Sequence, residues 1–121
     1  MQSLAFIITT SPLDNRTVTS INLITAALDN EVKVLGVFFY QQGVCNANKD
    51  VIIASDEFQP LKAWRNLQKK YGVPLHLCVT AAEKHGLIVE KQQENIDDAF
   101  TLSGLGELVE LSTQATRIIQ L

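Results

Sequence analysis

The sequence has little cysteine, and its two cysteines, Cys45 and Cys78, are far apart. No Cys-x-x-Cys pair occurs, which argues against thioredoxin-like exchange, and no cysteine and histidine have the spacing of a zinc site. The first apolar run, residues 4–9, lacks the basic segment that precedes it in a signal peptide. A chain with few cysteines and no export signal is predicted to be cytoplasmic.

Long hydrophobic runs and clusters of positive charge are also missing. No apolar run reaches the about 20 residues of a membrane-spanning helix, so no membrane contact is predicted. Ten Lys and Arg stand against 13 Asp and Glu, which gives a net charge of −3, and the only basic doublet is Lys69-Lys70. Strong direct binding of nucleic acid is therefore not expected. No glycine-rich loop follows residues 4–9, which argues against a nucleotide site there.

What the sequence does contain is an alternation of two patterns. With 46% hydrophobic residues in 121, the chain can bury one core, and residues 1–121 are predicted to form a single domain. Apolar, β-rich runs alternate with segments of helical periodicity. Strands are expected over residues 4–9, 32–39, 73–79, 99–102 and 116–121. This order predicts an α/β fold, with a mainly parallel five-stranded sheet and helices on both faces.

Local signals predict where the helices begin and end. Asp29-Asn30 should end the first helix, and Ser55-Asp56-Glu57-Phe58 should cap and start the second, which Gly72 then closes. Thr80 and Glu83 have the spacing of a capping box at the start of the third helix.

Two segments are less regular. Residues 40–55 are predicted to be a loop with room for a short helical turn, and residues 89–98 to be a surface helix or loop. Phe38-Phe39-Tyr40 and the loop after them are candidates for contact with homologous subunits. Trp64 is expected in the core or in such an interface.

Cys78 is the best candidate for chemistry. It ends an apolar strand and directly precedes a helix start. In parallel α/β folds, ligands and catalytic groups gather at the carboxyl ends of the strands, where Thr10, Tyr40, the loop around Cys45, and Ser103 are also expected. Backbone N–H groups at a helix start favour a thiolate, which is the nucleophilic form. The alternative is that Cys78 is a small buried hydrophobe.

The sequence offers no good candidate for a histidine base that would activate the Cys78 thiol. A Cys–His hydrolase needs an imidazole beside the thiol, and His85 lies at the far end of the short predicted helix. His76 and His85 are isolated in sequence, and each is predicted to have a structural or surface role. Thiol chemistry without a general base remains, and transfer of a sulfane sulfur between cysteines is such a reaction. It needs no metal and no cofactor. Ser103-Gly104-Leu105-Gly106 either supplies N–H groups to this site or only starts the last helix.

Several short motifs follow one another in a recognisable order. They are Phe38-Phe39-Tyr40, Gly43-Val44, Asn46-Ala47-Asn48, Ala54-Ser55-Asp56-Glu57-Phe58, Ala63-Trp64, Cys78-Val79-x-Ala81-Ala82 and residues 100–106. Together they span nearly the whole chain, which resembles the DsrE-like sulfur carriers and is most similar to the TusD group of that family. In the family, a cysteine after the third strand carries a persulfide, and Cys78 matches that position.

The resemblance implies a place in a relay. It implies a cytoplasmic sulfurtransferase subunit that serves 2-thiolation of the tRNA wobble uridine. The implied partners are a TusA-like sulfur donor, a TusE-like acceptor, and TusB-like and TusC-like homologous subunits in a heterohexamer. Related DsrE carriers do the same chemistry in dissimilatory sulfur oxidation, which stays an alternative, as does a noncatalytic assembly subunit.

The sequence departs from the family pattern in two places. Residues 87–98 form a shorter segment than in the TusD group. Cys45 occupies a position to which the resemblance assigns no role. It is therefore either a plain loop cysteine or a resolving thiol for Cys78.

Overall fold

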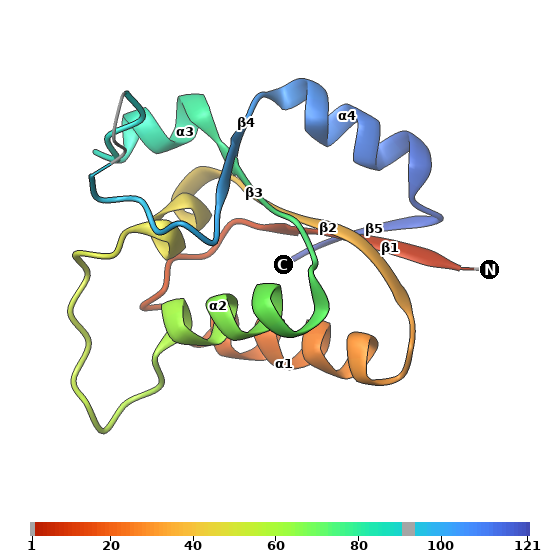
Figure 1. The fold of residues 1–121 in the computed structure, drawn as a ribbon, viewed down its shortest axis with the longest axis horizontal. Coiled ribbons are helices and arrows are strands. Elements are labelled where there is room, and N and C mark those ends of the chain that lie inside the picture. The colour runs from red at the N-terminus through yellow and green to blue at the C-terminus, as the bar shows by residue number, and fades with distance from the viewer. Residues whose placement is uncertain (1, 91–93) are drawn as a thin grey trace.

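A five-stranded parallel sheet forms the centre of the computed structural model, which describes residues 2–90 and 94–121 (Figure 1). The strands are β1 (Ser3–Ile8), β2 (Lys33–Phe39), β3 (Leu75–Cys78), β4 (Thr101–Ser103) and β5 (Arg117–Gln120). Their order across the sheet is β4-β3-β2-β1-β5, and every neighbouring pair is parallel. The predicted sheet is therefore confirmed. Within the segment 89–98, residues 91–93 lie outside the described residues.

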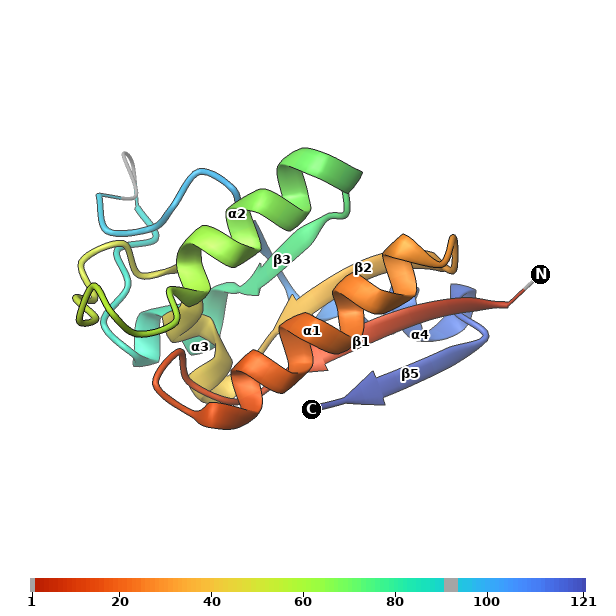
Figure 2. The ribbon, with the colours of Figure 1, turned by 90° about the horizontal axis from the view of Figure 1, so that it is seen from below.

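Helices cover both faces of this sheet, as predicted. The helices α1 (Asn15–Asp29) and α2 (Pro60–Tyr71) lie on one face, and α3 (Val79–Lys84) and α4 (Leu105–Gln114) lie on the other (Figures 1 and 2). A 3-10 helix, η1 (Gln41–Ala47), follows β2 and accounts for the predicted turn in the loop. In the described part of the chain, no helix has the length and apolar character needed to cross a membrane.

Two of the three aromatic residues of the Phe38-Phe39-Tyr40 motif lie in the core, together with Trp64. Phe38, Phe39 and Trp64 are fully buried. The Phe39 ring meets Trp64 and Phe100 edge to face, with centroids 4.9 and 5.0 Å apart. The prediction of a core position for Trp64 is confirmed. Phe38 and Phe39 are not available for contact with another subunit, because alternate residues of a central strand are covered by helices on each face.

The start predicted for α2 is wrong. The helix begins at Pro60, which suits the first helical position because proline lacks the N–H that would stay unpaired there. Residues 54–57 form a turn instead, with the Glu57 N–H donated to the Ala54 carbonyl at 2.9 Å. The side-chain amide of Gln59 holds that turn by donating to the Ala54 carbonyl at 3.0 Å. The predicted end is confirmed, since Gly72 caps the helix at φ +68°.

The cap predicted for α3 is also wrong. Cys78 itself is the N-cap of α3, so Thr80 lies inside the helix, and no capping box forms. This happens because β3 passes into α3 without a connecting turn. At α4 the N-cap is Gly104, and Ser103 directs its side chain to His76.

Candidate functional site

Cys78 lies at a cavity on the carboxyl edge of the sheet. The cavity has a volume of about 560 Å³. Its walls come from the ends of four strands and the segments after them: Thr9, Tyr40, Gln41, Gln42, Cys78, Thr80, Ala81, Lys84, His85 and Leu105. Cys78 is only 1% exposed, but Gln41, Lys84 and His85 are exposed, so the cavity that the thiol lines opens to solvent. Cys78 is therefore buried, in the wall of a cavity that opens to solvent.

The 3-10 helix η1 forms one wall of this cavity and is packed tightly on β1. The Tyr40 N–H donates to the Ile8 carbonyl at 3.0 Å, and the Gly43 N–H donates to the Tyr40 carbonyl at 2.8 Å. Gln41 has φ +51°, a left-handed conformation that is uncommon for a residue with a side chain. Strained backbone of this kind is often found at functional sites, and here it presents Gln41 to the cavity.

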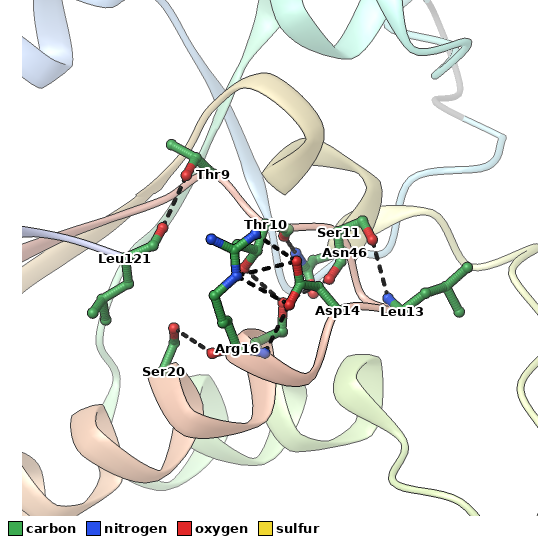
Figure 3. A network of polar contacts seen from close by, with 10 residues as sticks. Thr9, Thr10, Ser11, Leu13, Asp14, Arg16, Ser20, Asn46 and Leu121 are labelled. Carbon is green, nitrogen blue, oxygen red and sulfur yellow. Dashed lines mark hydrogen bonds and ion pairs between the residues drawn. The ribbon is translucent and has the colours of Figure 1, made fainter.

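A polar network holds the loop between β1 and α1 beside η1 (Figure 3). The Thr10 and Thr17 hydroxyls are 2.8 Å apart, and the Thr17 hydroxyl donates to the Ser11 carbonyl at 2.6 Å. Asn46 of η1 donates to the Thr10 carbonyl at 3.0 Å. Thr10 is therefore structural: it supports the wall of the cavity but does not line it.

The buried Asn46 side chain uses both ends of its amide. Its nitrogen also donates to the Gly43 carbonyl at 2.9 Å, and its oxygen accepts from the Trp64 indole N–H at 3.1 Å. This joins η1 to α2 across the core. Buried polar groups that are fully paired make a rigid arrangement, so the Asn46-Ala47-Asn48 motif has a structural explanation.

His76 belongs to a second polar cluster. Its Nδ1 is 3.0 Å from the Ser103 hydroxyl, and its Nε2 is 3.4 Å from Glu107 Oε1. Residues two apart in a strand face the same side, so His76 and Cys78 share the face of β3 that α4 covers. Ser103 is the register partner of Cys78 in β4, but neither Ser103 nor His76 lines the cavity. His76 is isolated in sequence, but in the structure it has two polar partners, Ser103 and Glu107.

The environment of His76 predicts a pH-dependent stability. Burial lowers its pKa, and the Glu107 carboxylate offsets this only in part. Below its ordinary pKa of about 6.5, the unfolded chain therefore binds more protons than the folded one. Stability is then lost as the pH falls from about 6.5 through the folded pKa. Denaturant unfolding of the protein and of His76→Gln should show a shallower pH dependence in the variant, by up to about one proton. Equal slopes would contradict the assignment.

Cys45 lies apart from Cys78. It is half-buried and lines a different, small cavity of about 30 Å³, with Pro12 and Val51 among its neighbours. Burial raises the pKa of the Cys45 thiol, which reduces the thiolate fraction. Both cysteines are free thiols, and they line different cavities. Within residues 2–90 and 94–121, no three His, Cys, Asp or Glu side chains are grouped so that they could hold a metal ion.

Lys84 and His85 are the cavity residues that the sequence argument missed. His85 caps the end of the short helix, which makes it a poor base for Cys78 on sequence grounds, yet it lines the same cavity as Cys78. No hydrogen bond links it to the Cys78 sulfur in the described chain. The place of both residues could have been inferred from sequence. Lys84 and His85 are three and four positions after Ala81, so they lie on the same side of the helix as Ala81.

Comparisons with known proteins agree with this architecture. The model of the DsrE/DsrF-like family matches residues 2–121. The chain is 40% identical over 102 residues to a Sulfurtransferase TusD homolog of Pasteurella multocida, which covers 80% of this chain and 81% of that protein. It is also 40% identical over 102 residues to Sulfurtransferase TusD of Klebsiella pneumoniae, covering 78% and 80% of the two chains. The crystal structure of the YchN protein of E. coli superposes with a TM-score of 0.84 over 100% of both chains, and at 16% identity this likeness shows the fold.

Proposed function

The chain belongs to the DsrE/DsrF-like family, and from this premise we propose that it is a sulfurtransferase subunit that carries a persulfide on Cys78. The observation that supports this most is the position of Cys78, at the N-cap of α3 and in the wall of a solvent-open cavity. Relatives that cover about four-fifths of this chain are named Sulfurtransferase TusD.

The proposed reaction moves one sulfur atom without net oxidation. The Cys78 thiolate attacks the terminal sulfur of a donor persulfide, R–S–SH. A new S–S bond forms at Cys78, the S–S bond of the donor breaks, and the donor leaves as the thiolate R–S⁻. The proton remains on the transferred sulfur, so the product is Cys78–S–SH. The same exchange with an acceptor thiolate restores Cys78.

The partners are proposed from the resemblance of the sequence to the TusD group. We propose that a TusA-like protein loads Cys78 and that a TusE-like protein unloads it, with TusB-like and TusC-like subunits completing a heterohexamer in the cytoplasm. The sulfur would then serve 2-thiolation of the tRNA wobble uridine. The net charge of −3 supports a role that hands sulfur to a protein and does not itself bind the nucleic acid.

The test is to find which cysteine receives the sulfur. The protein is treated with a persulfide donor, its thiols and persulfides are alkylated, and peptides are analysed by mass spectrometry. The extra sulfur should be found on the Cys78 peptide and be nearly absent from the Cys45 peptide, because Cys45 has a raised pKa and lies at another cavity. Equal labelling of both peptides, or no labelling, would contradict the proposal and favour a noncatalytic subunit.

A further inference from the structure

Among the described residues that line the Cys78 cavity, Lys84 is the one that carries a full charge at neutral pH. The other polar residues of the wall are His85, hydroxyls and amides. None of the described residues in its wall has a carboxylate side chain. The chain as a whole has a net charge of −3, so this cavity differs in charge from the rest of the molecule.

The acidic residues nearest in sequence are directed elsewhere. Glu83, next to Lys84 on α3, lines a separate hollow together with Glu90. Glu107, close after Leu105, lies against His76 at 3.4 Å. Among the described residues, Lys84 takes part in no ion pair. Its charge is therefore available to a molecule in the cavity.

From this arrangement we infer that the cavity accepts a low-molecular-weight sulfane-sulfur donor with a negatively charged group, and that Lys84 selects for that charge. The inference rests on the proposed function of Cys78. A volume of about 560 Å³ lies within the range of small-molecule sites, which are roughly 300–1,000 Å³. Tyr40, Ala81 and Leu105 supply apolar wall for the donor's carbon skeleton. Cys78 would thus have a route of loading that needs no protein donor.

The chemical step is the exchange described above, with a small persulfide as R–S–SH. The Cys78 thiolate takes the terminal sulfur, and the small thiolate R–S⁻ leaves with its acidic group still near Lys84. No oxidant or reductant is consumed. The carboxylate of the donor is not part of the reacting bond, so its contribution can be measured separately from the chemistry.

Two donors that differ in one charge provide the test. N-acetylcysteine persulfide carries a carboxylate, and N-acetylcysteine amide persulfide has the same skeleton without it. We expect the full chain to be loaded at Cys78 about three to ten times faster by the carboxylate donor at low salt, which is the size of effect that a partly solvated pair of unit charges gives. The preference should decrease with added salt.

Variants at two lysines test whether the preference for the carboxylate donor comes from the cavity or from the general charge of the protein. In Lys84→Gln the ratio of the two loading rates should fall to near one, and Lys84→Arg should restore it. Lys69→Gln removes the same charge from an exposed position on α2, away from the cavity, and should keep the wild-type ratio. An unchanged ratio in Lys84→Gln, or no preference in the wild type, would overturn this inference alone. If neither small donor loads Cys78 but a persulfide carried by a protein does, the inference fails and the proposed function stands. If no donor of either kind loads Cys78, the proposed function fails and the inference fails with it.

Discussion

Replacing Cys78 with serine is expected to reduce sulfane-sulfur uptake from about one atom per chain to background. A hydroxyl at this position cannot attack a persulfide sulfur as a thiolate does, and its conjugate base is not populated near neutral pH. The remaining thiol, Cys45, does not replace it, because burial raises the pKa of Cys45 and it lines a different cavity. Intact-mass measurement after exposure to a persulfide donor detects the loss directly.

Two further variants make the result of that experiment unambiguous. Cys78 is 1% exposed, so the serine hydroxyl costs about 1–3 kcal/mol if it finds no partner, and Cys78→Ala avoids that polar group. Cys45→Ser should retain full uptake and serves as the matched control. If Cys78→Ala still takes up one sulfur atom while Cys45→Ser does not, Cys45 is the carrier, and the assignment made here is wrong.

The sheet and the place of Cys78 in it could be predicted from the sequence because they depend on local patterns. Apolar runs such as residues 32–39 are long enough and regular enough to indicate buried parallel strands. Because strands that alternate with helices are parallel, their carboxyl ends all lie at the same edge of the sheet. Cys78 and Tyr40 end or follow two of these strands, so both are expected at that edge.

The cavity walls and the caps could not be predicted in the same way, since they depend on contacts between distant segments. The pairing of His76 with Ser103 follows from the register of β3 and β4, which no local pattern encodes. The helix start assigned to Ser55 had the right residue types, but the contacts of Gln59 with the preceding turn move the start to Pro60. Lys84 and His85 look like solvent-exposed residues in sequence, and only the packing of α3 against η1 brings them to the thiol's cavity.

Gly43→Ala is expected to be among the most destabilising single changes in the chain. A Cβ at residue 43 would lie 1.9 Å from the Ile8 carbonyl oxygen and 2.7 Å from its carbon, so backbone must move. The Ile8 carbonyl also accepts the Tyr40 N–H at 3.0 Å, and displacing it breaks the contact that seats η1 on β1. We expect a loss of about 3 kcal/mol or more in the free energy of unfolding. The midpoint of thermal unfolding should fall by about 10 °C or more.

Gly106→Ala makes the same chemical change, but its expected effect on the free energy of unfolding is opposite in sign. Gly106 lies within α4, and nothing is within 4 Å of its Cβ position, so alanine should stabilise the helix by up to about 1 kcal/mol. Because Tyr40, Gln41 and Gln42 line the cavity, folded Gly43→Ala at low temperature should also load Cys78 more slowly, whereas Gly106→Ala should load at the wild-type rate. Equal stability of the two alanine variants would show that η1 does not sit on the end of β1, and the wall of the sulfur site would then have to be assigned to other residues.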